Sequence, residues 1–234
     1  MRIGRRPTGT TPGTASPRFP GYDVVSQRHT WDEETAGVVL GRLAPPPEPV
    51  RFFTEHERPT ARALLDRLLG QDDEPRIPVL EMVDERLLAG DGDGYRYHDM
   101  PEDPEAWRRS IAGLDADAET QWGRLFHQLR TDQQMALIED VRTADGMWQG
   151  LPAARVFSLW LRYGCATFYA HPWAWNEIGF GGPAYPRGYA NIGLNRREPW
   201  ERPERDAHDP IGWVERAEAA RAAHDAGLRA ERGA

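Results

Sequence analysis

Lysine is missing from this 234-residue sequence, and cysteine occurs once. All 29 basic residues are arginine, so no lysine can form a Schiff base or act as a general base. The single cysteine, Cys165, excludes an internal disulfide and any zinc or iron–sulfur site built from several cysteines. Cys165 lies in an apolar run, which favours a buried, inert thiol over a reactive one.

Long apolar runs and excess positive charge are also missing. The longest apolar run, residues 156–170, contains Arg162 and is too short to span a bilayer. A net charge of −8 and a pI near 5.4 give no general attraction to nucleic acid or anionic lipid. Arg5 and Arg6 resemble the start of a twin-arginine export signal, but no apolar segment follows them. We therefore expect a cytoplasmic protein that neither inserts into a membrane nor binds nucleic acid.

Helical spacing of apolar residues runs through most of the chain, and no alternating strand pattern bounded by hairpin turns occurs. Two stretches have the form of a capping box, Thr54–Glu57 and Thr131–Gln134. The pattern predicts an all-α fold with a compact domain of about six to eight helices. The helices are expected at residues 31–43, 54–69, 78–90, 104–111, 117–130, 131–141 and 152–168, and from residue 209 onward.

Composition divides the chain into four parts. Residues 1–20 are rich in Pro, Thr and Gly and predict a disordered tail, whereas 21–50 hold one short helix and a Pro-rich linker. Residues 51–195 form the helical domain, and 196–234 are a charged extension with a terminal helix.

A calcium-loop template matches DGDGYRYHDMPE, residues 91–102, at its acidic positions. Asp91, Asp93, Asp99 and Glu102 stand at positions 1, 3, 9 and 12, but Arg96 replaces the glycine that the sharp turn needs. A Gly- and Asp-rich loop between two helices explains the same residues. We find no H-x-x-x-H pair, no G-x-S-x-G nucleophile motif and no G-x-G-x-x-G dinucleotide loop. The sequence therefore predicts no catalytic residue, no bound metal and no cofactor on this chain.

The stretch HPWAWNEIGFGGPAYPRGY, residues 171–189, combines aromatic residues with Gly and Pro. These breakers predict a long irregular loop in place of a helix. Tyr, Trp and Arg are enriched at protein interfaces, so the loop is a candidate docking segment. The alternative is that its aromatics pack on this domain's own helices, and both can hold. In an extended strand, Trp173 and Trp175 would point to opposite sides. The predicted partner-binding residues are His171, Trp173, Trp175, Asn176, Glu177, Phe180, Tyr185, Arg187 and Tyr189.

Four motifs in order resemble the gluconate 2-dehydrogenase subunit 3 family over roughly residues 50–193. They are Phe52-Phe53-Thr54 with Glu57, the acidic turn at 72–78, the helix end at 168–172, and the turn WNEIGFGG at 175–182. WAW replaces the family's usual GGN before the turn, and the frequent twin-arginine signal is missing, which suggests a cytoplasmic member.

The resemblance implies a small, helical, non-catalytic subunit. Its partner would be an FAD-dependent catalytic subunit of the GMC oxidoreductase type, which oxidises sugars, sugar acids or related alcohols and which the small subunit helps to mature, fold or be exported. Some complexes of this family add a cytochrome c subunit.

Two other classes stay open at this point. One is a small metal-dependent enzyme that uses His171 and Glu177, and the other is a stand-alone binder of a small molecule in a site lined by the aromatics.

Overall fold

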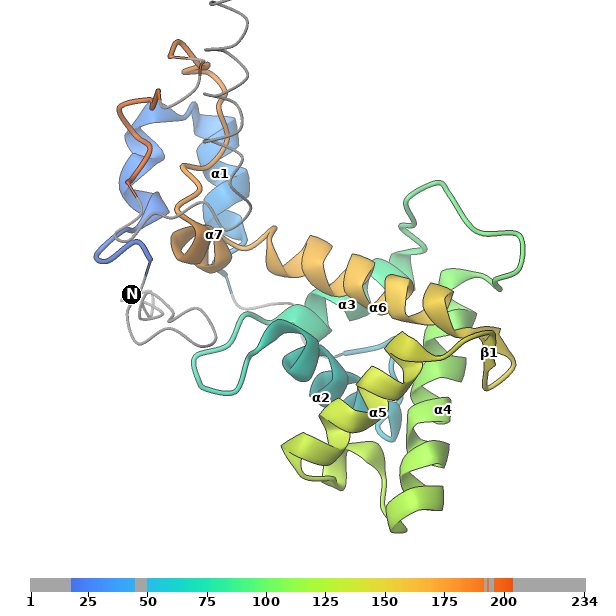
Figure 1. The fold of residues 1–234 in the computed structure, drawn as a ribbon. Helices are drawn as coiled ribbons and strands as arrows, with labels where there is room; N and C mark the ends of the chain where they lie inside the picture. The colour runs from blue at the N-terminus through green and yellow to red at the C-terminus, as the bar shows by residue number, and fades with distance from the viewer. Residues whose placement is uncertain (1–17, 45–49, 192, 194–195, 204–234) are drawn as a thin grey trace, which may run out of the picture.

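The structure, a computed structural model, describes residues 18–44, 50–191, 193 and 196–203. Most of the predicted N-terminal tail, the Pro-rich run of the linker and the predicted terminal helix lie outside these residues. Within them nearly all of the regular secondary structure is helical, which confirms the all-α prediction (Figure 1).

Five helices form the larger part of the molecule, which we call the helical body, residues 50–171. They are α2 (Glu57–Leu69), α3 (Val79–Ala89), α4 (Asp103–Trp122), α5 (Thr131–Thr143) and α6 (Ala153–Phe168). The amphipathic helix α6 contacts each of the other four, so its buried face is the centre of the core. Trp160 of α6 and Trp107 of α4 are fully buried there, together with Phe53.

A smaller unit, the aromatic lobe, gathers segments from both ends of the chain. It consists of residues 18–44 together with the described residues from 172 to 203. It contains the 3₁₀ helix η1 (Val24–Thr30), α1 (Glu33–Gly41) and α7 (Pro172–Ile178). In Figure 1, α1 lies beside α7 at one end of α6, away from α4 and α5. Its own core consists of Phe19, Tyr22, Val24, Trp31, Val39 and Trp175.

A buried carboxylate anchors the entry to α2. Asp84 of α3 accepts hydrogen bonds from the backbone N–H groups of Arg51, Phe52 and Phe53, each at 2.8 Å. The predicted capping box follows directly. Glu57 Oε2 accepts from Thr54 N at 2.9 Å, and Thr54 Oγ1 accepts from Glu57 N at 3.3 Å. These bonds explain in physical terms why the motif Phe-Phe-Thr and its glutamate belong together.

The predicted helix at 117–130 is wrong. A single helix, α4, continues to Trp122 and ends at Gly123, which adopts the left-handed conformation with φ 65°. Phe126 instead lies in a short 3₁₀ turn, η2 (Phe126–Gln128), where it is buried in the body core. Apolar spacing marked the correct core residue but could not show that the chain turns at Gly123.

The second predicted capping box is displaced by one residue. Arg130 is the N-cap residue of α5, and Gln133 Oε1 accepts from its N–H at 3.1 Å. Gln134 is buried and donates to the carbonyl of Phe126 at 3.1 Å. The predicted start of the helix is therefore correct. Gln133, and not Gln134, accepts the capping hydrogen bond.

A short hairpin before α6 was not expected. Strands β1 (Met147–Trp148) and β2 (Leu151–Pro152) pair antiparallel through a turn in which Gln149 and Gly150 both have positive φ. Two-residue strands are too short to show an alternating pattern. The hairpin places the Trp148 ring over Gly113 of α4, where a Cβ atom would lie only 2.8 Å from the ring.

Candidate functional site

The aromatic segment begins with a helix, which corrects the prediction of an irregular loop over its whole length. Pro172 and Gly179 bracket α7, and the seven residues from Pro172 to Ile178 contain no further breaker. Pro is tolerated at the first helical position, and Gly179, with φ 69°, closes the helix. His171 caps the start, since its Nδ1 accepts from Trp173 N at 3.2 Å. The irregular loop therefore starts at Gly179.

Three of the nine predicted partner-binding residues are buried within this chain. They are His171, Trp175 and Asn176. Trp175 donates from Nε1 to the Tyr169 carbonyl at 2.5 Å, and Asn176 Oδ1 accepts from Val24 N at 2.7 Å. These side chains fix α7 to the end of α6 and to the N-terminal segment, so their contacts are internal.

Trp173, Glu177 and Arg187 are half-buried. Trp173 packs against the body core and makes an edge contact with the His171 ring. Both tryptophans therefore pack on a core, Trp173 on that of the body and Trp175 on that of the lobe, and they do so from a helix and not from the expected extended strand. Arg187 donates to Thr30 Oγ1 at 2.8 Å and to the Gly181 carbonyl at 2.5 Å, and burial lowers the pKa of its guanidinium. Arg187 therefore joins the loop to η1.

Phe180, Tyr185 and Tyr189 are exposed, with 40%, 67% and 49% of their surface accessible. Ile178 and Tyr169 are exposed beside them in the chain. The segment thus splits into an inner set that holds the lobe together and an outer set whose side chains stay partly exposed, although Phe180 makes an edge contact with Trp175 and Tyr189 lies beside Trp200. The sequence left interface and self-packing open, and the structure shows self-packing for the inner set.

Sequence reasoning missed the lobe residues that come from outside 171–189, namely Phe19, Tyr22, Trp31 and Trp200. A usable signal was present in the run Gly-Phe-Gly-Gly at 179–182, because glycine often marks a position where other atoms approach the backbone closely. The sequence could not show which rings of this chain approach these glycines. Phe19, Tyr22 and Trp31 lie more than 140 residues before them, and Trp200 follows the loop.

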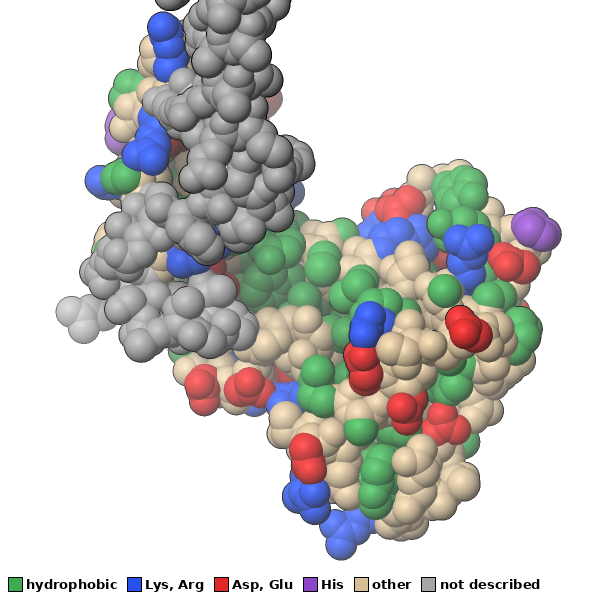
Figure 2. All heavy atoms as spheres, in the orientation of Figure 1, with side chains coloured by type: hydrophobic (Ala, Val, Ile, Leu, Met, Phe, Trp, Pro, Cys, Tyr) green, Lys and Arg blue, Asp and Glu red, His purple; other side chains and the backbone are tan. Residues whose placement is uncertain are grey.

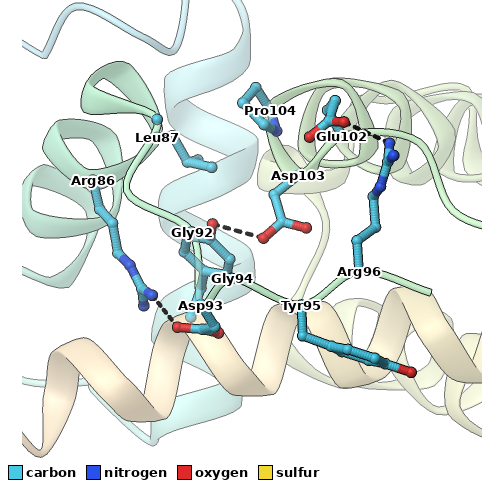
Figure 3. Close-up of a pocket in the computed structure, with 12 residues that line it drawn as sticks. Arg86, Leu87, Gly92, Asp93, Gly94, Tyr95, Arg96, Glu102, Asp103 and Pro104 are labelled. Atoms are coloured by element: carbon cyan, nitrogen blue, oxygen red, sulfur yellow. Dashed lines mark hydrogen bonds and ion pairs between the residues drawn. The ribbon is translucent and has the colours of Figure 1, made fainter.

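A cavity of about 530 Å³ opens where the 91–102 loop meets α3, α4 and α6. Figure 3 shows its charged lining, with Arg86 facing Asp93 and Arg96 facing Glu102. Arg162 bridges Asp93 at 2.5 Å and Asp103 at 2.8 Å. Burial acts to raise the pKa of Asp93, but Arg86 and Arg162 outweigh it and lower that pKa. The charges of this cavity are therefore matched inside the chain.

The calcium template does not assemble into a cation site in the described part of the chain. Asp93 and Glu102, two of its four acidic positions, are engaged by arginine. Among the described residues, no group of three or more His, Cys, Asp or Glu side chains could hold a metal ion. His171, proposed as a metal ligand with Glu177, instead uses Nδ1 to cap α7.

The surroundings of Cys165 and Tyr163 raise the pKa of each side chain, which favours its protonated, less reactive form. Burial raises the pKa of the Cys165 thiol, which keeps it protonated at neutral pH. Burial and a hydrogen bond of 2.8 Å to Asp103 raise the pKa of Tyr163. Over the described residues, no helix combines the length and apolar character needed to cross a bilayer.

The fold and the site define a class, a small helical protein with a packed body and a lobe that exposes aromatic side chains. A protein-family model described as Gluconate 2-dehydrogenase subunit 3 matches residues 55–182, which is more than half of the chain. The chain belongs to the gluconate 2-dehydrogenase subunit 3 family, whose name denotes an accessory subunit of a dehydrogenase complex. No curated protein and no solved structure matches the chain.

Proposed function

We propose that this chain is a non-catalytic subunit that binds and stabilises an FAD-dependent catalytic subunit of the GMC oxidoreductase type. That partner would oxidise a sugar, a sugar acid or a related alcohol and would carry the FAD. Family membership supports the proposal, because the family is named for a subunit of gluconate 2-dehydrogenase, and a subunit of a dehydrogenase complex implies a dehydrogenase partner. The matched charges of the cavity beside the 91–102 loop agree with a role outside the chemistry itself.

The observation that carries the proposal is the outer face of the aromatic lobe. Phe180, Tyr185 and Tyr189 are exposed, while the backbone between them is held by Arg187. A rigid backbone lowers the entropy lost on binding, and Tyr and Phe offer large apolar area to a partner. Exposed aromatics on a fixed loop are therefore suited to a protein interface.

Tyr185→Ala tests the proposal, with Met147→Ala as a matched control. Tyr185 in the lobe and Met147 on the hairpin of the body are almost equally exposed, at 67% and 65%. Each variant would be co-expressed with an FAD-dependent dehydrogenase sought in the neighbouring reading frames and purified through a tag on this chain. We expect Tyr185→Ala to weaken retention of the flavoprotein by roughly tenfold or more, as for an interface hot spot.

Met147→Ala should retain the flavoprotein as the wild-type chain does. FAD absorbance that elutes with the large subunit would support the placement of the cofactor, and haem absorbance would reveal a cytochrome subunit. A wild-type chain that retains no flavoprotein, or equal retention by both variants, would contradict the proposal.

A further inference from the structure

Aromatic rings from outside the WNEIGFGG turn lie directly on its glycines. A Cβ atom on Gly179 would overlap the ring of Phe19, and one on Gly182 would overlap the ring of Trp31. On Gly181 a Cβ atom would lie 2.7 Å from Cδ1 of Trp200. Because these three glycines have no side chain, each leaves space above its Cα atom, and one aromatic ring of this same chain fills each space.

Hydrogen bonds join the same two segments. The buried amide of Val24 donates to Asn176 Oδ1 at 2.7 Å, and Tyr22 Oη donates to the Phe180 carbonyl at 3.1 Å. The polar groups that line the turn are thus used by the N-terminal segment. If that segment left, Tyr22, Val24 and Trp31 would return from a buried state to water.

The family match includes the WNEIGFGG turn but not the rings that cover it. It runs from residue 55 to residue 182, so the turn belongs to the matched region, whereas Phe19, Trp31 and Trp200 do not. Residues 18–44 therefore lie outside the matched region and cover one of its motifs.

We infer that residues 18–44 are a fixed part of the partner-binding surface, and that the dehydrogenase contacts the outer face of the completed lobe instead of the turn beneath it. This inference rests on the proposed function. The described residues of the lobe hold seven arginines and seven acidic residues, a net charge of zero. A surface without net charge that exposes Phe180, Tyr185 and Tyr189 fits a partner surface that carries apolar side chains and no strong net charge.

Gly182→Ala in the full chain tests the inference, with Gly188→Ala as its control. Both glycines lie in the same loop with positive φ, 79° and 70°, so both substitutions strain the backbone alike. Only the methyl group on residue 182 would meet a ring, that of Trp31, because Gly188 has no atom within 4 Å of its Cβ position. Comparison of the two variants therefore separates displacement of the Trp31 ring from strain in the loop backbone.

Two measurements apply to each variant, namely hydrogen exchange of the Val24 amide and retention of the co-expressed dehydrogenase. We expect Gly182→Ala to speed Val24 exchange and to lower retention at least tenfold, and Gly188→Ala to change neither as strongly. Trp31→Ala, which removes the ring without a clash, should reproduce both effects if Gly182→Ala folds poorly.

Three results would overturn the inference while the wild-type chain still binds the dehydrogenase. They are faster Val24 exchange with unchanged or improved retention, no change in Val24 exchange, and an equal loss of retention in Gly188→Ala. Failure of the wild-type chain to retain the dehydrogenase would instead refute the proposed function, and this surface with it.

Discussion

The helical body and the aromatic lobe are built in different ways. The body buries one continuous core around α6, whereas the lobe depends on six buried side chains brought together from residues 19–39 and from α7. Their charges differ too. The body has 14 arginines and 22 acidic residues, a net charge of −8, while the described lobe is neutral. Figure 2 shows acidic side chains scattered across the visible face of the body.

This contrast suggests a division of roles, in which the body provides the stability of the fold and the lobe provides the surface for contact with a partner. The body is well packed and acidic, and a net charge of this size opposes self-association. Five of the large exposed apolar side chains lie in the much smaller lobe, at Val38, Ile178, Phe180, Tyr185 and Tyr189. We expect damage to the body to unfold the chain and damage to the lobe to change binding first.

The largest expected effect is in the body core, at Trp160→Ala. Trp160 is fully buried and donates from Nε1 to Ser110 Oγ at 2.9 Å. Removal of a buried tryptophan leaves a cavity and should lower the free energy of unfolding by about 3–5 kcal/mol. Urea denaturation followed by far-UV circular dichroism measures this loss. A loss below about 1 kcal/mol would show that α6 is not the centre of the core.

Asp84→Ala should have the next largest effect. The carboxylate accepts three backbone N–H groups, of which those of Phe52 and Phe53 are buried, and each charge-assisted bond contributes about 1.5–3 kcal/mol. We expect a loss of about 3 kcal/mol or more in the same denaturation experiment. Asp72→Ala, which removes an exposed carboxylate from its ion pair with Arg67, serves as the control and should change stability by less than about 1 kcal/mol.

Asn176→Ala should open the lobe and leave the body intact. The substitution leaves the buried Val24 N–H without its acceptor, at a cost of about 1–3 kcal/mol to the docking of the N-terminal segment. Hydrogen exchange should speed up in residues 22–31 and stay unchanged in α6. Equal acceleration in both regions would show that body and lobe unfold as one cooperative unit.

The smallest expected effect concerns pH and the capping box. Burial acts to raise the pKa of Glu57, but hydrogen bonds from Thr54 and Arg108 outweigh it and lower that pKa below its ordinary value of 4.5. The stabilisation is therefore complete above pH 4.5 and is lost as the pH falls through the lower, folded-state pKa. Glu57→Gln should flatten this part of the acid denaturation profile. An unchanged profile would assign the acid sensitivity to other carboxylates.

Prediction from sequence succeeded where the signal is local. The starts of α2, α3, α5 and α6 lie within about three residues of the predicted ones, and Gly90 closes α3 at the end of the predicted 78–90 helix. Prediction failed at α7, because Pro and Gly were counted as breakers although they stand only at its two ends. The partner-binding role of the outer aromatics stays a prediction, while the buried positions of Trp175 and Asn176 needed the structure.

By itself the sequence determined the helical class and the family motifs, because caps, breakers and apolar spacing act over a few residues. It also determined that residues 171–189 would be rich in aromatic surface. Only the tertiary structure decided which aromatics face inward. The rings of Phe19 and Trp31 meet Gly179 and Gly182 across more than 140 residues, and such a contact depends on the folding of the whole chain between them.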